Sequence, residues 1–208
     1  MRRTNVELRW WLAAIVCFAA FAVLGTVVSV RTPTRIDVEA VAMRGSFVPL
    51  AAFFTSLGRW FVLAPVAIAA AIVALALRAN VLAIAALMVS QLVSQGVVAM
   101  LKGIFHRTRP DYWLVQREAD LSYPSGHAVT TVVFYVALAL LVWRTTALPR
   151  PVAIAIVTAL GIAIVGIPWS RLALGAHYLT DVIGGLLFGA GWLFVTLAIL
   201  TRSGVAAR

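Results

Sequence analysis

Six long runs of apolar residues dominate this sequence and restrict its possible folds more than any other feature. A helix needs about 20 apolar residues to cross a lipid bilayer. We therefore expect an all-α, polytopic membrane protein with six transmembrane helices in a bundle. The runs extend from Trp10 to Val30, from about Trp60 to Leu77, from Val81 to Leu101, from Ala128 to Trp143, from Val152 to Ile167, where Pro168 should end the helix, and from about Asp181 to Leu200.

The composition excludes the main alternatives to a membrane protein. Of the 208 residues, 63% are hydrophobic and 12% are charged, whereas a soluble domain carries about 25% charged residues. So many apolar side chains do not fit inside a water-soluble body of this size, and disordered chains are poor in apolar residues. Cys17 is the only cysteine, which excludes a disulfide scaffold. Because no repeat or linker interrupts the chain, residues 1–208 are predicted to form one domain.

The chain is strongly basic, with a formal net charge of +10. In a soluble protein this balance would suggest nucleic acid as a partner. Here the basic residues are scattered between apolar runs, so we interpret them as anchors in loops and as part of an anion site, and we expect no nucleic-acid partner. Sixteen of the 17 basic residues are arginine, and the single lysine is Lys102.

Polar side chains gather in three short segments beside the predicted helices, and polar residues at membrane depth usually mark function. The segments are Lys102–Pro110, Pro124–His127 and Ser170–Asp181. Because an even number of membrane crossings separates them, all three should face the same side of the membrane. They can therefore converge on one site.

The first chemical feature of these segments is a set of groups that suit a phosphate. Lys102, Arg109 and Arg171 are cations, and the planar arginine fork matches phosphate oxygens. The sequence Pro124-Ser125-Gly126 opens a predicted helix, where free backbone N–H groups favour a bound anion. Together these groups predict a phosphate cradle.

The second feature is a pair of histidines, His127 and His177. Asp181 lies four residues after His177, so a helix places both side chains on one face. A carboxylate beside an imidazole fixes its tautomer and stabilises its charged form. This spacing is typical of an activated nucleophile with its orienting group.

In this order, the three segments resemble the signature of the type-2 phosphatidic acid phosphatase superfamily, also called the lipid phosphate phosphatases. That signature reads K-x6-R-P, then P-S-G-H, then S-R-x5-H-x3-D. All eleven fixed positions match with the required internal spacings, and the chain's single lysine stands where the signature demands one. The motifs cover residues 102–185, and the predicted six-helix layout extends the resemblance to most of the chain.

The resemblance implies a role for each matching residue. His177 would be the nucleophile that takes the phosphoryl group, and Asp181 would orient it. His127 would protonate the leaving oxygen and then assist the attack of water on the phosphohistidine. No metal or other cofactor is expected. The phosphate oxygens would be held by Lys102, Arg109, Arg171, Ser125 and Gly126.

Other polar residues are expected to have no part in the chemistry. His106 and Arg107 lie between motif positions. A short apolar stretch, residues 47–54, should form a helix in the membrane interface. We expect interhelical hydrogen bonds from Ser90, Gln91, Ser94 and Gln95, and a solvated loop face at Asp111, Glu118 and Asp120.

The predicted function is removal of a terminal phosphate from a lipid phosphate or diphosphate at the membrane face. Polyprenyl (undecaprenyl-type) diphosphate is the favoured substrate, and phosphatidic acid and phosphatidylglycerol phosphate are the alternatives. A small anion or lipid transporter is the alternative of another class, although transport needs no nucleophile. Besides membrane lipids, no further partner is predicted.

The small size and the arginine- and alanine-rich composition favour a bacterial plasma (inner) membrane. Eight basic residues fall on the side of the termini and nine on the opposite side. Three of those nine are assigned to phosphate, so the remaining charges favour cytoplasmic termini and a site on the extracytoplasmic face.

Overall fold

The computed structural model describes residues 2–30, 33–111, 113–114 and 118–203, with residues 2–4 and 203 described by their backbone only. Within these ranges the chain forms helices joined by loops, and no strand occurs. Arg31, Arg117 and Arg208, which entered the charge count above, lie outside the described residues. The predicted all-α class is confirmed.

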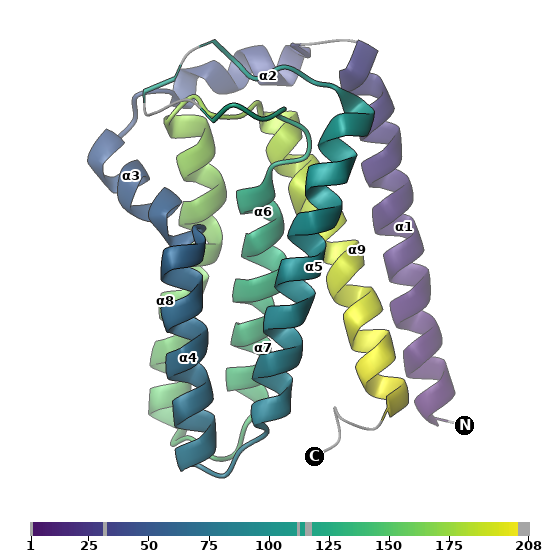
Figure 1. Cartoon of the computed structure of the whole chain (residues 1–208), viewed down its shortest axis with the longest axis vertical. Coiled ribbons are helices and arrows are strands. Elements are labelled where there is room, and N and C mark those ends of the chain that lie inside the picture. The colour runs from purple at the N-terminus through teal and green to yellow at the C-terminus, as the bar shows by residue number, and fades with distance from the viewer. Residues whose placement is uncertain (1, 31–32, 112, 115–117, 204–208) are drawn as a thin grey trace.

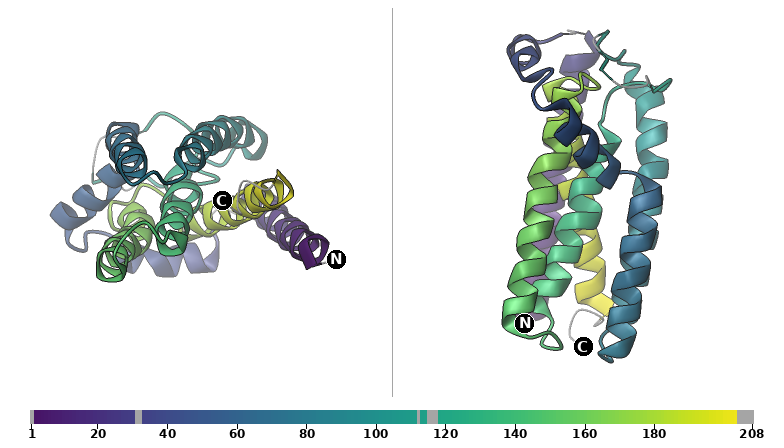
Figure 2. Two further views of the ribbon diagram at one scale, coloured as in Figure 1. Left: turned by 90° about the horizontal axis from the view of Figure 1, so that it is seen from below. Right: turned by 90° about the vertical axis from the view of Figure 1, so that its left-hand side faces the viewer.

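Six helical segments run side by side along the long axis of the molecule (Figures 1 and 2). Five of them are long and apolar enough to cross a membrane, and α4 is a shorter apolar helix of 17 residues. They coincide with the six apolar runs, which confirms the predicted helical membrane bundle. The segments are α1 (Arg2–Val30), α4 (Trp60–Ala76), α5 (Val81–Phe105), the continuous α6 (Gly126–Thr130), η2 (Thr131–Val136) and α7 (Ala137–Arg144), α8 (Arg150–Ala173), and α9 (Leu179–Ser203).

Three short helices lie at one end of this bundle, between α1 and α4 (Figure 1). They are α2 (Arg35–Ala40), the 3-10 turn η1 (Val41–Met43) and α3 (Val48–Leu57). α3 forms at the apolar stretch expected to be helical, and its place in the membrane interface stays a prediction. Pro49 in its first turn suits a helix start, where the missing N–H has no intrahelical partner.

The prediction that Pro168 ends its helix was wrong. α8 continues through this proline to Ala173. A proline removes one intrahelical hydrogen bond, but membrane helices tolerate it where side chains or neighbouring helices satisfy the freed backbone groups. In α8 the carbonyl that loses its donor is that of Ile164, and the helix is nevertheless continuous from Arg150 to Ala173. The extra helical turn carries Ser170 and Arg171 into the buried end of the bundle.

Hydrogen bonds between helices fix α5 against its neighbours. Gln91 Nε2 donates to Thr130 Oγ1 at 2.8 Å, and Gln95 Nε2 donates to the Gly126 carbonyl at 3.2 Å. Ser90 Oγ accepts from Trp192 Nε1 at 2.9 Å. These contacts confirm the interhelical role predicted for three of the four polar residues, whereas Ser94 bonds to a carbonyl of its own helix. They also fix the start of α6 in place.

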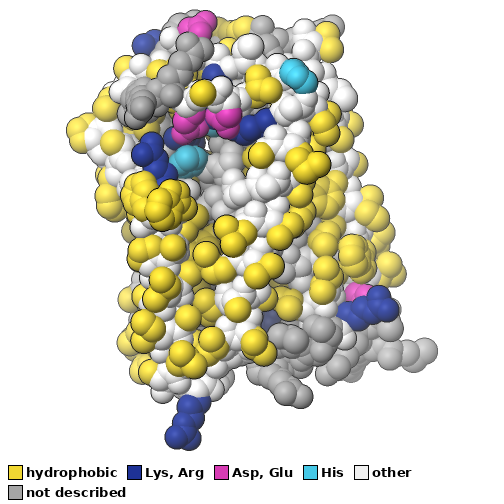
Figure 3. All heavy atoms as spheres, viewed as in Figure 1, with side chains coloured by type: hydrophobic (Ala, Val, Ile, Leu, Met, Phe, Trp, Pro, Cys, Tyr) yellow, Lys and Arg dark blue, Asp and Glu magenta, His cyan; other side chains and the backbone are white. Residues whose placement is uncertain are grey.

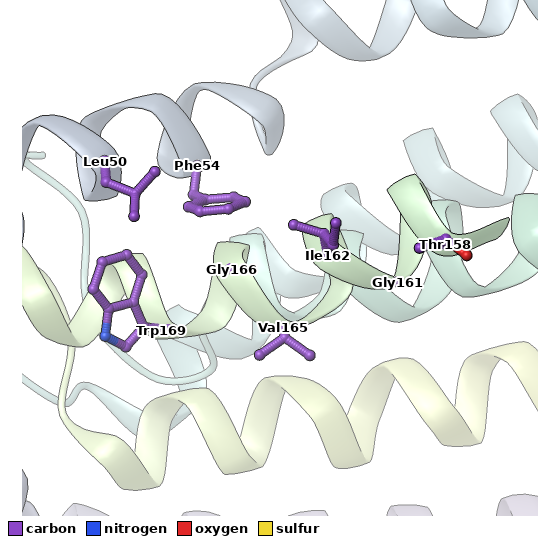
Figure 4. Close-up of a pocket in the computed structure, with 8 residues that line it drawn as sticks. All are labelled: Leu50, Phe54, Thr158, Gly161, Ile162, Val165, Gly166 and Trp169. Atoms are coloured by element: carbon purple, nitrogen blue, oxygen red, sulfur yellow. The ribbon is translucent and has the colours of Figure 1, made fainter. Parts of the chain in front are cut away.

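The helices α3 and α8 pack closely together, and a groove runs along their outer side. Phe54 of α3 covers Gly166 of α8, where an added Cβ would come within 2.2 Å of the phenyl ring. The next residue, Thr55, is buried. The groove holds about 520 Å³ and is lined by Leu50, Phe54, Thr158, Gly161, Ile162, Val165, Gly166 and Trp169 (Figure 4).

Another close approach joins α9 to the loop before α6. A Cβ at Gly184 would lie 2.2 Å from the Tyr123 ring. Tyr123 cannot move away easily, because it is buried, stacks on Phe21 at 5.3 Å between ring centroids, and donates its hydroxyl to the Phe21 carbonyl at 2.7 Å. This contact sets the position of the first turns of α9.

Gly184→Ala should therefore destabilise the protein by about 1–3 kcal/mol, the usual cost of overpacking. Gly96→Ala is the matched control, because a Cβ there meets nothing within 4 Å and alanine favours a helix over glycine. Thermal unfolding of the two purified variants in detergent checks this. Equal melting temperatures would show that the Tyr123 contact is not restrictive.

Candidate active site

The three polar segments meet at the same end of the bundle. This end lies opposite the start of α1 and the end of α9 (Figure 1). Figure 3 shows basic, acidic and histidine side chains gathered around a hollow there, above a surface that is largely hydrophobic. The predicted site residues come from the ends of α5 and α8, the starts of α6 and α9, and the loops beside them.

His177 lies between a carboxylate and a guanidinium. Its Nδ1 is 3.3 Å from Asp181 Oδ2, and its Nε2 is 2.9 Å from Arg109 Nη1. With the ring proton on Nδ1 and directed at Asp181, the Nε2 lone pair accepts from Arg109. The predicted pair of His177 and Asp181 thus exists, one helical turn apart at the start of α9, with Nε2 facing a predicted phosphate ligand.

The surroundings of His177 favour its neutral form. Burial, followed by the charges of Arg109, Arg171 and Lys102, holds the pKa of this imidazole well below its usual value. A neutral imidazole has a free electron pair on one ring nitrogen. His177 is therefore in the protonation state that a nucleophile needs.

Arg107, which was expected to have no part in the chemistry, is buried behind this pair. Its Nη1 donates to Asp181 Oδ1 at 2.6 Å, and its Nη2 donates to Asp37 Oδ2 at 2.6 Å. The guanidinium also lies over the Tyr178 ring, 4.3 Å from the centroid, a favourable cation–π arrangement. The Asp181 carboxylate also accepts hydrogen bonds from the Tyr178 N–H at 2.9 Å and from the Ser122 hydroxyl at 3.3 Å.

Two carboxylates that were expected on a solvated loop face are exposed (Asp120) and partly exposed (Glu118), and both also reach the predicted phosphate ligands. Asp120 pairs with both Lys102 and Arg109. Glu118 pairs with Arg109 at 2.7 Å and with Arg171 at 2.8 Å. The reason is physical: three nearly buried cations draw in the nearest anions when no other anion is bound. Asp111 is exposed, as predicted.

Thr55 connects Arg171 to His127. Arg171 Nη1 donates to Thr55 Oγ1 at 2.6 Å, and His127 Nε2 lies 3.2 Å from the Thr55 carbonyl. Because a carbonyl only accepts, this contact places a proton on Nε2 of His127. The two histidines thus belong to one continuous set of contacts through Arg171, Glu118 and Arg109.

Two of the predicted phosphate ligands each have a buried side-chain atom without a hydrogen-bond partner. Among the described residues, the buried side-chain atoms without a partner are Arg171 Nε, Ser125 Oγ and Gln91 Oε1. Two of these three belong to predicted phosphate ligands, and such orphaned groups call for an explanation. The Ser125 N–H, by contrast, donates to the Asp181 carbonyl at 3.1 Å, so this amide is not free as expected for the anion cradle. Gly126 is partly exposed beside it.

Sequence reasoning missed Asp37, Thr55 and Arg107. A signal for Arg107 does exist, because residues 106–110 are not helical and side chains two positions apart in an extended segment point the same way. Arg107 and Arg109 both reach the start of α9 in this manner. Asp37 is one of only seven acidic residues, which is a weaker signal.

An anion that binds to the three cations competes with Asp120 and Glu118 for them. Asp120→Asn should therefore bind inorganic phosphate or orthovanadate about three- to tenfold more tightly, the effect expected for a half-exposed ion pair. Titration calorimetry of the purified protein measures this. Glu39→Gln, which removes an exposed acid from α2, should bind as the parent does. Unchanged or weaker binding by Asp120→Asn would mean that this carboxylate does not compete.

Comparison with known proteins now adds independent information. Decaprenylphosphoryl-5-phosphoribose phosphatase from Mycobacterium tuberculosis (strain H37Rv) is 36% identical over 102 residues, which are 47% of this chain and 50% of that protein. Lipid A 1-phosphatase from Rhizobium johnstonii is 35% identical over 124 residues, which are 54% and 46% of the two chains. The chain thus spans about half the length of the curated relatives it matches.

The fold has a close counterpart among solved structures. The crystal structure of a transmembrane PAP2-type phosphatidylglycerolphosphate phosphatase from Bacillus subtilis superposes with a TM-score of 0.74, covering 91% of this chain and 96% of that chain at 23% identity. Together with the apolar spans, this likeness supports an integral membrane protein. The sequence pattern of the PAP2 superfamily matches residues 80–204, more than half of the chain and all three polar segments. The chain therefore belongs to the PAP2 superfamily.

Proposed function

We propose that this protein is an integral membrane phosphatase that removes a terminal phosphate from a lipid phosphate or diphosphate. The observation that carries the proposal is the environment of His177, a neutral imidazole between Asp181 and the cations of the site. An anion carrier needs the cations but has no use for an oriented, unprotonated nucleophile. The orphaned Arg171 Nε and Ser125 Oγ supply further groups for phosphate oxygens.

In the first step, His177 Nε2 attacks phosphorus and the bond to the leaving oxygen breaks. Lys102, Arg109 and Arg171 hold the phosphate oxygens together with Ser125 and Gly126. The proton on Nδ1 of His177 stays hydrogen-bonded to Asp181 and balances the charge that the imidazole gains. For this step His127 has to be the imidazolium ion, with a proton on both ring nitrogens: it gives its Nε2 proton to the leaving oxygen, which replaces the Thr55 carbonyl as acceptor, and becomes a neutral imidazole.

In the second step, water attacks the phosphohistidine. His127, now a neutral imidazole with a free lone pair on Nε2, takes a proton from this water, and the bond between phosphorus and His177 Nε2 breaks. Inorganic phosphate leaves, and both histidines return to their starting states. No step needs a metal or another cofactor, because the guanidinium and ammonium groups balance the phosphate charge.

For the substrate we propose a polyprenyl diphosphate, with phosphatidic acid and phosphatidylglycerol phosphate as alternatives. One relative is named as a phosphatase of a decaprenylphosphoryl compound, which supports a polyprenyl chain. We also propose a bacterial plasma membrane, with the site on its extracytoplasmic face. The charge count supports this orientation, and so does the position of the site at the end of the bundle away from the start of α1.

The variants His177→Ala and His127→Ala should lose activity at different steps of the reaction. His177→Ala removes the nucleophile and should leave no phosphoenzyme, whereas His127→Ala should accumulate it because water attacks slowly without a general base. Hydrolysis by His127→Ala should fall by about 10² to 10⁴, the usual value of general acid–base help. The measurement is acid-labile, base-stable label on the protein after mixing with a ³²P-labelled lipid phosphate.

The third histidine provides the control. His106 is exposed at the end of α5, so His106→Ala should hydrolyse lipid phosphates at the rate of the parent. Label on His177→Ala protein would contradict the assignment of the nucleophile. If the parent released no phosphate from any lipid phosphate or diphosphate, the proposed function itself would fail.

The pH dependence of kcat/KM should report the cations around His177. They lower the pKa of this residue, so the neutral nucleophile persists to pH values below the usual histidine range. Lys102→Gln removes one positive charge, which raises the pKa of His177 and moves the acid side of the profile to higher pH. The pH at half-maximal kcat/KM is compared with that of the parent on the same substrate. A shift to lower pH would be the wrong sign for this account.

A further inference from the structure

We infer that Arg107 and Asp37 are positioning residues for the reaction: they hold Asp181 and leave the group behind His177 with one net negative charge. The inference deepens the proposed function and rests on it, because it concerns the step in which His177 takes the phosphoryl group. Arg107 stands at a variable position of the first motif, and Asp37 lies outside all three. Arg107 contacts Asp181, and Asp37 contacts Arg107 and Thr180, so we expect their effect to pass through Asp181.

The contacts around Arg107 leave it one possible orientation. Its Nη1 donates to Asp181 Oδ1 and to Thr180 Oγ1, both at 2.6 Å, and its Nη2 donates to Asp37 Oδ2 at 2.6 Å. The side chains of Arg107, Asp37 and Asp181 are all fully buried. A guanidinium held by two carboxylates from opposite sides cannot rotate without breaking a buried ion pair, which is costly.

Asp37 in turn is fixed to the helix that carries the nucleophile pair. Its Oδ1 accepts from the Thr180 N–H at 2.9 Å and from Thr180 Oγ1 at 2.8 Å. Its Oδ2 also accepts from the N–H and hydroxyl of Thr34, at 3.0 and 2.8 Å, which closes the first turn of α2. Because Thr180 immediately precedes Asp181, α2 determines where α9 begins.

The charges of this group add up to a value that suits the reaction. Arg107 alone would neutralise Asp181 and leave nothing to balance a positive imidazole. Asp37 shares the same guanidinium, so the two carboxylates and one cation carry a net charge of −1. When His177 Nε2 bonds to phosphorus while Nδ1 keeps its proton, the ring becomes positive and this single negative charge lies directly behind it.

The two half-reactions should depend on this charge in opposite senses. Formation of the phosphohistidine creates the positive ring, so a lost negative charge slows it. Hydrolysis returns the ring to its neutral form, so the same loss does not slow it. A residue that only stabilises the fold would not separate the two steps in this way.

The test compares Asp37→Asn with Glu39→Gln by rapid mixing with a ³²P-labelled lipid phosphate and a quench in alkaline detergent, which preserves phosphohistidine. The introduced asparagine can still accept from Thr180 through its amide oxygen but carries no charge, and Glu39 is exposed on the same helix. For Asp37→Asn we expect phosphorylation of His177 to slow by about ten- to a hundredfold, a typical loss for partners that orient a reactive ligand. Dephosphorylation should not slow, and KM should stay within about threefold.

An Asp37→Asn protein that phosphorylates as fast as Glu39→Gln would overturn the inference. If Asp37→Asn does not accumulate in the membrane, Arg107→Lys and Arg107→Met test the other half of the inference, which is that a cation holds Asp181 in place. The inference requires the charged lysine variant to phosphorylate at least about tenfold faster, and equal rates overturn it.

These outcomes are distinct from failure of the proposed function. If the parent does not hydrolyse lipid phosphates, or carries label although His177 is replaced, the proposed function is wrong whatever Asp37 does. If the parent behaves as proposed and the variants do not, only the role of Asp37 and Arg107 is lost.

Discussion

A carboxylate that is shut off from water at the start of α9 determines the arrangement around it. Asp181 has no exposed surface, and an unpaired charge in such a place would cost several kcal/mol. The segment after α5 supplies Arg107, the loop before α6 supplies Ser122, and the backbone of Ser125 bonds to the Asp181 carbonyl. Three segments that are distant in sequence are thus fixed in position by the need to satisfy one residue.

On the other side of His177, two carboxylates offset part of the positive charge of the site. Lys102, Arg109 and Arg171 are held by Glu118 and Asp120, so the five side chains keep one net positive charge, and a phosphate competes with the two acids for the cations. The free energy of binding is then the difference between two sets of ion pairs.

The helices and the motif residues could be predicted from local features. Long apolar runs specify membrane helices because no other element buries them, and the spacing of His177 and Asp181 places them one turn apart on α9. Pro168 misled the prediction because a membrane helix tolerates a proline that would end a helix in water. Asp37, Thr55 and Arg107 were missed because their importance lies in partners about 70 to 140 positions away. Glu118 and Asp120 looked like loop acids because only the folded chain brings them to three unpaired cations.

The dependence on α2 and α3 has a consequence for how such a protein can be divided. The superfamily pattern begins at residue 80, yet Asp37 fastens the beginning of α9, and Thr55 contacts both Arg171 and His127. The half of the chain that carries all three motifs is therefore not a self-contained cassette. A chimaera that joins residues 80–204 to the first two membrane segments of another protein inherits the signature intact, but it needs an acid and a hydroxyl at the matching places to keep the same interior. A substitution at Asp37 or Thr55 therefore acts on a site whose signature lies entirely in the other part of the chain.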